Sequence, residues 1–348
     1  MPDARSSGDD PSGHDQDHDS GFWRVDLEVD VTTVVGGPES TVLRGWAAGP
    51  NARADGPTLV AYCLAGGGCS TSYFDLQVPG LVGYSMAEHL ARRGVVVVAV
   101  DHLGVGSSDA HDLFAVTPTL LAACHSAAVG TIIERIECGE LPPGGPAIGD
   151  PFVIGIGHSM GAMLTGVVQA RHRPYDALVL LGHGGIGMPE VLSPEELAVS
   201  GPDLESIEDD LVRLARARFG SGSTVERRRP SRGTFFTESV PDEVRAAFRM
   251  AAVPLLPVCG LTSMVPHSAH HEKASIDVPA FLAFGDHDLI DDYVGTVTQF
   301  PAVEDLALFV LRDSGHCHNQ ATYRAVLWDR FVAWVRDASR TPWSRASR

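Results

Sequence analysis

The chain has 348 residues and a formal net charge of −18. Its length is sufficient for one large domain, or for one domain that carries an insertion. The hydrophobic fraction of 44% is typical of a soluble globular protein. The strong acidic balance argues against nucleic acids and anionic membrane surfaces as partners, because both carry the same sign of charge.

The two ends of the chain differ in composition from the rest. Residues 1–21 contain six aspartates among serine, glycine and histidine, and no apolar run that would favour an ordered structure. We predict a disordered acidic tail here, in which His14 and His18 are solvated rather than metal ligands. Residues 341–348 are predicted to form a short mobile tail.

Targeting and redox features favour a cytoplasmic location. The N-terminus has neither the basic start nor the apolar segment of a signal peptide, and no apolar run reaches the ~20 residues that a membrane helix needs. The six cysteines lack CxxC spacing. This pattern is typical of free thiols in a reducing compartment rather than of disulfides or a zinc site.

Strand and helix patterns alternate through the first half of the chain. The alternating apolar residues of 22–48 predict an antiparallel hairpin whose second strand lies within 34–46. Continuous apolar runs predict buried strands at 58–65, 95–100, 151–156 and 177–181, with helices at 83–93 and 119–137. This order predicts an α/β fold with a mostly parallel central sheet flanked by helices.

The alternation stops after residue 184 and resumes at residue 277. Residues 185–276 have no comparable buried strand and instead show helical patterns at 206–218 and 241–252, separated by a basic polar stretch at 224–233. We interpret this block as an inserted, mainly helical cap, which divides the core into residues 22–184 and 277–340. The core then continues with strands at 278–284 and 306–311 and a helix at 322–336.

A Gly-x-Ser-x-Gly pentad stands between a predicted strand and a predicted helix. It reads Gly157-His158-Ser159-Met160-Gly161. A chain with 37 glycines can contain such a pentad by chance. Its position favours a nucleophile elbow, in which the serine occupies a sharp turn and the two glycines allow the strand and the helix to approach closely.

A serine nucleophile needs a histidine base, and the base needs a carboxylate that fixes its tautomer. Such residues follow the last two predicted strands. The first strand is followed by Gly285-Asp286-His287-Asp288, and the second by Ser314-Gly315-His316-Cys317-His318. On position alone, either aspartate could be the acid, and either His316 or His318 could be the base.

The elbow, the insertion and the order Ser, Asp, His resemble the α/β-hydrolase superfamily over residues 22–339. The resemblance implies that Asp288 is the acid, because the family's acid typically lies three residues after the glycine that ends its strand. It also implies His316 as the base, since the base typically follows a glycine after the final strand. Asp286 and His318 remain the alternatives, with Asp286 as a turn cap.

Acyl transfer also needs hydrogen-bond donors for a tetrahedral oxyanion. The backbone N–H of Met160 is expected to be one donor, and the resemblance implies Gly67 as the other. Many members of the family carry His-Gly in this loop, whereas this chain has Ala65-Gly66. We expect Gly66, Gly68 and His158 to contact the substrate, because a run of glycines favours close backbone approach to a ligand.

Several other features are predicted to have no chemical role. Cys69 and Cys317 are expected to shape the site rather than to attack, since a serine elbow is present. The Gly-x-Gly of residues 104–106 lacks the third glycine of a dinucleotide fingerprint. The histidines at 267, 270 and 271 match no ligand motif. No metal or organic cofactor is therefore expected.

Together these features predict a serine hydrolase that cleaves a carboxylic ester or lactone of a small to medium, largely apolar substrate. A C–C bond hydrolase, a thioesterase or an acyltransferase with the same triad is the enzymatic alternative, and a non-catalytic ligand receptor on the same fold is a further one. Apolar residues of the cap form either a pocket wall or the cap's own core. These residues are Met250, Leu255, Leu256, Val258, Leu261 and Met264.

Overall fold

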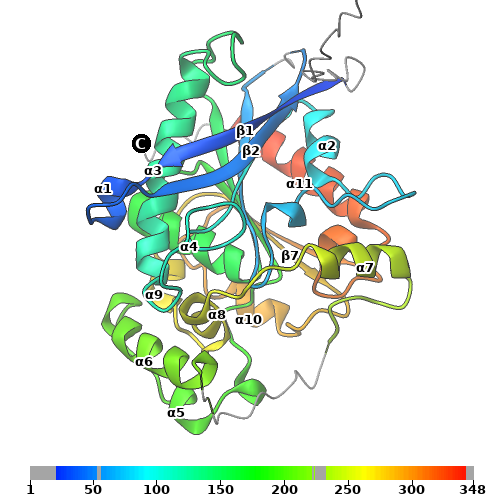
Figure 1. Ribbon diagram of the computed structural model, residues 1–348. Coiled ribbons are helices and arrows are strands. Elements are labelled where there is room, and N and C mark those ends of the chain that lie inside the picture. Colours follow the sequence, from blue (N-terminus) through cyan, green and yellow to red (C-terminus); the bar gives the residue numbers. More distant parts are fainter. Residues whose placement is uncertain (1–20, 53–55, 222, 224–232, 342–348) are drawn as a thin grey trace, which may run out of the picture.

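The computed structural model describes residues 21–52, 56–221, 223 and 233–341 (Figure 1). Residues 1–20, the basic stretch at 224–232 and residues 342–348 lie outside this description. The predictions made for both tails, and for His14 and His18, therefore stay predictions. No helix in the described part is long and apolar enough to cross a membrane.

The core is one eight-stranded sheet with the order β1-β2-β4-β3-β5-β6-β7-β8. β1 pairs antiparallel with β2, β2 pairs antiparallel with β4, and every later pairing is parallel. The predicted α/β fold with a mostly parallel sheet is thus confirmed. The strands are β1 (Phe22–Asp30), β2 (Val42–Pro50), β3 (Leu59–Leu64), β4 (Val95–Val100), β5 (Phe152–His158), β6 (Ala177–Leu181), β7 (Ala280–Gly285) and β8 (Leu306–Leu311).

The inner strands are buried along their whole length. Every residue of β3, β4, β5, β6 and β7 is buried. A parallel sheet is covered on both faces, which is why these strands read as continuous apolar runs rather than as alternating patterns. The prediction for β2 was partly wrong, because the chain forms the short helix α1 (Thr32–Val35) and a turn before the strand begins at Val42.

Helices cover both faces of the sheet. α3 (Pro118–Glu137) and α4 (Met160–His172) pack on one face, and α2 (Met86–Ala91) and α11 (Arg324–Ala338) pack on the other (Figure 1). The helix predicted at 83–93 is shorter than expected. It starts after Ser85, whose side chain accepts a hydrogen bond from the backbone N–H of Glu88 and so caps the first turn.

The segment between β6 and β7, residues 182–279, is helical and contains no strand among its described residues. Figure 1 shows most of its helices gathered beyond one end of the sheet. α8 contacts both α6 and α4, which joins this segment to the core. Its helices are α5 (Pro194–Leu197), α6 (Glu208–Phe219), α7 (Asp242–Met250), α8 (Pro257–Met264) and α9 (His270–Ala274), with the 3₁₀ turns η2 (Pro189–Val191) and η3 (Glu205–Ile207).

Three short elements lie in the loops that follow strands. They are η1 (Thr71–Tyr73) after β3, α10 (Tyr293–Val297) after β7 and η4 (His318–Gln320) after β8. Since β3, β5, β6, β7 and β8 are parallel, their carboxyl ends share one edge of the sheet. The loops that carry the predicted site residues therefore meet at this edge, where ligand sites of α/β sheets usually lie.

Candidate active site

Ser159 occupies a strained turn between β5 and α4. Its φ of 54° and ψ of −120° place a non-glycine residue in a rarely populated region of backbone space. Its backbone N–H donates to the carbonyl oxygen of Leu181 at 2.8 Å, which fixes the turn to β6. The surrounding structure thus holds Ser159 at the tip of a strand-to-helix turn, as the pentad predicts.

The glycines on either side of Ser159 are required by close packing. A Cβ atom on Gly157 would come within 2.4 Å of the carbonyl oxygen of Gly161. A Cβ atom on Gly161 would come within 2.1 Å of the carbonyl oxygen of Leu64 at the end of β3. Both distances are far below van der Waals contact, so any side chain would force the strand and the helix apart.

Asp288 and His316 meet through a short hydrogen bond. The Nδ1 atom of His316 lies 2.7 Å from Oδ1 of Asp288, and both side chains are almost fully buried. The Oδ1 atom also accepts the backbone N–H of Leu289 at 2.7 Å, and Oδ2 accepts that of Gly285 at 3.2 Å. A carboxylate that only accepts hydrogen bonds requires a proton on Nδ1, which leaves Nε2 of His316 free to act as a base.

His318 forms a hydrogen bond with the second oxygen of the same carboxylate. Its Nε2 atom lies 2.8 Å from Oδ2 of Asp288, and its side chain is completely buried. Although burial opposes ionisation, charge attraction and hydrogen bonds from His316 and His318 hold the pKa of Asp288 well below its usual range. Asp288 is therefore a carboxylate at neutral pH.

Asp286 and His318, the alternative acid and base, make other contacts than Asp288 and His316 do. Asp286 accepts a hydrogen bond from the backbone N–H of Ser314 at 3.0 Å, as expected for a residue that caps the turn. His318 is turned toward Asp288 and does not line the cavity next to Ser159. The geometry therefore favours Asp288 and His316 over these two residues.

A cavity of about 260 Å³ lies next to both Ser159 and His316. Ser159 and His316 both line it, together with Gly67 and Met160. Met160 is the first residue of α4, where a backbone N–H has no helical acceptor and is available to a ligand. No hydrogen bond joins Ser159 to His316 in the described structure, but both face the same space.

The three residues predicted to contact the substrate do not line this cavity. His158 is buried, donates from Nε2 to the carbonyl oxygen of His316 at 2.8 Å, and stacks on Tyr73. Gly66 faces the Nδ1 atom of His158, where a Cβ atom would come within 2.8 Å. The carbonyl of Gly68 accepts the backbone N–H of Val253 at 3.0 Å. These residues contact neighbouring segments of the chain and do not face the cavity.

Besides Ser263, the cavity wall holds two ionisable residues, His183 and Arg218, that were not predicted from the sequence. His183 follows β6, and its buried Nε2 atom has no partner in the described structure. Burial, with further effects of Lys273 and His316, holds its pKa well below the usual range, so His183 is neutral. Arg218 forms a buried ion pair with Glu196 at 2.7 Å. Neither residue belongs to a motif, so only their position in the fold identifies them.

Apart from Ser263, the remaining side chains of the lining are apolar and come largely from the segment of residues 182–279. Leu255 and Met264 line the cavity, whereas Leu256, Val258 and Leu261 are buried in the core and Met250 is 86% exposed. The apolar residues of this segment therefore divide between a pocket wall and a core. The other apolar lining residues are Met160, Met188, Val191, Phe235, Leu289 and Ile290.

Among the described residues, the cysteines form no disulfide and the cysteines and histidines form no metal-binding cluster. All six cysteines are free. Burial raises the pKa of Cys69 to about 12 and that of Cys317 well above its usual range, so both thiols are protonated at neutral pH. No cluster of three or more histidine, cysteine or acidic side chains with metal-binding geometry occurs among the described residues.

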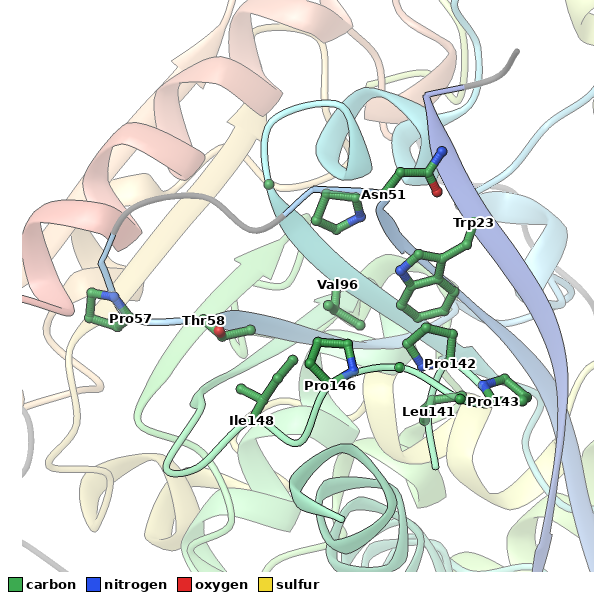
Figure 2. Close-up of a pocket in the computed structure, with 14 residues that line it drawn as sticks. Trp23, Asn51, Pro57, Thr58, Val96, Leu141, Pro142, Pro143, Pro146 and Ile148 are labelled. Atoms are coloured by element: carbon green, nitrogen blue, oxygen red, sulfur yellow. The ribbon is translucent and has the colours of Figure 1, made fainter. Parts of the chain in front are cut away.

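A larger cavity, of about 420 Å³, lies at the opposite end of the sheet (Figure 2). Thr58 and Gly94 line it, and they immediately precede β3 and β4, so it opens at the amino ends of these strands. None of the predicted site residues lines it. Figure 2 shows Trp23 and a group of prolines around it, namely Pro57, Pro142, Pro143 and Pro146.

The chain belongs to the alpha/beta hydrolase family, whose sequence model matches residues 61–329. The match extends from β3 to α11 and thus includes every residue of the site described above. No curated protein matches the chain.

Solved structures show the same fold at low sequence identity. A thermophilic esterase from Thermogutta terrifontis is 16% identical, with 90% of this chain and 99% of that chain covered and a TM-score of 0.60. A bromoperoxidase from Bacillus anthracis is 13% identical, with 90% and 100% covered and a TM-score of 0.58. An E-2-(acetamidomethylene)succinate hydrolase is 14% identical, with 90% and 100% covered and a TM-score of 0.55. These likenesses show the fold alone.

Proposed function

We propose that the protein is a serine hydrolase that cleaves a carboxylic ester or lactone of a small to medium, largely apolar substrate. The observation that carries this proposal is the shared cavity of Ser159 and His316, with His316 held by Asp288 at 2.7 Å. Membership of the alpha/beta hydrolase family and the fold shared with an esterase support it.

In the proposed reaction, Oγ of Ser159 attacks the acyl carbon while Nε2 of His316 takes its proton. The charge that develops on His316 is stabilised by Asp288, which is already ionised. His316 then gives the proton to the leaving alcohol, and an acyl group remains on Ser159. Water, activated by the same histidine, releases the acid in a second round.

The oxyanion of the tetrahedral intermediate would be held by the backbone N–H groups of Met160 and Gly67. Both residues line the cavity beside Ser159. The N–H of Met160 lies at the amino end of α4, where the helix dipole also favours negative charge. Removal of one such donor typically slows acyl transfer by about 10² to 10³-fold.

The size and lining of the cavity support the proposed substrate class. Its walls are mainly apolar and its volume is about 260 Å³, which suits a short acyl group better than a long lipid chain. Polar side chains on the wall include Ser263, neutral His183 and the paired Arg218, and the last two are suited to a hydroxyl or carbonyl group of the substrate. We propose that residues 185–276 act as the cap that sets this specificity.

A substrate panel tests the proposal. It would contain p-nitrophenyl esters and lactones of graded size, one acyl thioester and one β-diketone. We expect turnover of short apolar esters by the wild type, and a loss of about 10³ to 10⁶-fold in Ser159→Ala. Full activity in Ser159→Ala would contradict the mechanism. Turnover of the diketone or the thioester alone would favour the enzymatic alternatives.

Covalent labelling separates an enzyme from a non-catalytic receptor. A fluorophosphonate probe should label Ser159, and mass spectrometry of the labelled peptide would locate it. Ser263 is a matched control because it lines the same cavity, but its hydroxyl donates to the carbonyl of Gly260 at 2.8 Å. Ser263→Ala should still be labelled and Ser159→Ala should not. An unlabelled wild type would favour a receptor.

A further inference from the structure

Asp288 is shared by two histidines, one on each carboxylate oxygen. His316 bonds Oδ1 at 2.7 Å and His318 bonds Oδ2 at 2.8 Å. A catalytic triad needs only the first of these contacts. The second therefore requires its own explanation, since His318 is fully buried and lines no part of the cavity.

We propose that His318 is a positioning residue that holds the second oxygen of Asp288 and thereby reduces the proton affinity of His316. This role rests on the proposed function, in which His316 is the base. It adds a residue that touches neither substrate nor reacting atoms and acts only through Asp288.

The hydrogen bonding around His318 defines its tautomer. Nε2 faces an ionised carboxylate, which can only accept, so Nε2 carries the proton. Nδ1 is buried without a partner in the described structure, and an N–H group there would be left unsatisfied. His318 is thus a fixed donor with one target. Its backbone N–H also donates to the carbonyl of His316 at 3.1 Å, which joins the backbones of the two histidines.

The effect on His316 follows from the charge on Asp288. A donor on Oδ2 draws negative charge away from Oδ1, which weakens the attraction between Asp288 and a protonated His316. The direction is the same if His318 itself becomes protonated, because a positive charge would offset the carboxylate further. In either state His318 makes His316 easier to deprotonate, and the free base persists to lower pH.

Except for Lys273, the buried titratable groups around the pair keep one charge state in the range where an imidazole titrates. Burial lowers the pKa of His158 and His183 and raises that of the tyrosines and thiols, so these groups stay neutral. Asp286 has a lowered pKa and stays ionised. Burial lowers the pKa of Lys273 to about 7, within that range, but its charge acts on His183 and the residue is the same in every variant below. The neutral groups nearest the pair are His158, His183, Tyr73, Tyr293, Cys69 and Cys317.

The test compares His318→Leu, which removes the donor, with His318→Gln, whose amide N–H can reach the same oxygen. The titration of His316 would be followed by long-range ¹H–¹⁵N spectra of the ¹⁵N-labelled full chain. We expect its midpoint to rise by about one pH unit in His318→Leu, the size expected for the loss of one hydrogen bond to a charged group. His318→Gln should restore most of the wild-type value.

The same variants would be assayed with p-nitrophenyl butyrate across pH. We expect the acid limb of kcat/KM to move to higher pH in His318→Leu by the same amount, with KM little changed. An unmoved midpoint in His318→Leu, or equal shifts in both variants, would overturn the inference. If neither variant folds, the wild-type spectra decide, because a proton on Nδ1 of His318 would contradict its role as donor.

The spectra need no turnover, so this inference and the proposed function can fail separately. A wild type that neither hydrolyses esters nor reacts with the fluorophosphonate would count against the hydrolase. If the titration midpoint of His316 does not depend on residue 318, only the positioning role of His318 is contradicted.

Discussion

The Nε2 atom of His158 donates a hydrogen bond of 2.8 Å to the backbone carbonyl of His316. His158 immediately precedes Ser159, so this bond joins the turn of Ser159 directly to the loop that carries His316. The ring of His158 is held in place by Tyr73, which stacks on it with centroids 4.2 Å apart. Burial holds the pKa of His158 well below its usual range, so the donor is a neutral imidazole at working pH.

Replacement of His158 by leucine should therefore lower kcat while leaving KM nearly unchanged. The bond does not contact substrate, but its loss allows the loop of His316 to shift, and a shift near 1 Å can reduce the rate by about 10²-fold. His158→Gln is the matched control, because its amide can donate to the same carbonyl, and it should lose less activity. Steady-state kinetics on an ester substrate would show this, and equal losses in the two variants would contradict it.

The two glycines of α4 provide a second test. Alanine at Gly161 would place Cβ 2.1 Å from the carbonyl oxygen of Leu64, whereas alanine at Gly166 meets nothing closer than Ile276 at 3.6 Å. Gly161→Ala should lower the free energy of unfolding by about 1–3 kcal/mol or more. Gly166→Ala should be neutral or stabilising by up to about 1 kcal/mol, since alanine favours a helix. Urea unfolding of both variants would measure this, and equal midpoints would contradict the packing argument.

The strands, and the positions of the polar residues that follow them, could be predicted from sequence because each depends on local pattern. β3, β4 and β5 are apolar runs buried on both faces, and Ser159 lies in a short motif with a steric reason for each glycine. The placement of Asp288 next to His316 follows from two parallel strands that end at the same edge of the sheet.

The details that depend on contacts between distant segments could not be predicted. The carbonyl of Thr234 accepts the N–H of His316 at 2.7 Å, which joins the β6–β7 segment to His316 across 82 positions of sequence. The contact of His158 could not be predicted for a similar reason, because its ring has a partner that lies 158 residues away. The sequence around His158 is the same whether its side chain contacts substrate or bonds a distant carbonyl.

The buried ion pair of Arg218 and Glu196 should be important for stability. The two side chains are 4% and 2% exposed and 2.7 Å apart, and Arg218 also donates to the carbonyl of Val191. Arg218→Met would leave a buried carboxylate without its partner, which typically costs about 3–5 kcal/mol. Arg213→Met is the control, because its pair with Glu195 is exposed and such pairs contribute about 0–1 kcal/mol. Thermal or urea unfolding would distinguish them, and similar losses would contradict the role of burial.

Lys273 should make stability depend on pH above neutrality. It is the only lysine of the sequence, it is buried, and its Nζ atom donates to Gln299 at 3.0 Å. Burial lowers its pKa to about 7 from an unfolded value of 10.5, against the smaller attraction of Glu272. Between these two values the unfolded chain holds a proton that the folded chain does not. The free energy of unfolding must therefore rise with pH, by about 1.4 kcal/mol per unit from this group.

A comparison with Lys273→Met isolates this effect, because all other groups are common to both proteins. The stability of the wild type relative to the variant should rise between pH 7 and 8.5 and be constant below pH 6, where both states of the wild type are protonated. Urea unfolding at each pH would measure the difference. ¹³C-labelled lysine would give a single Cε signal, with a midpoint near 7 in the folded protein and near 10.5 in urea. A folded midpoint above 10 would contradict the burial of an uncompensated amine.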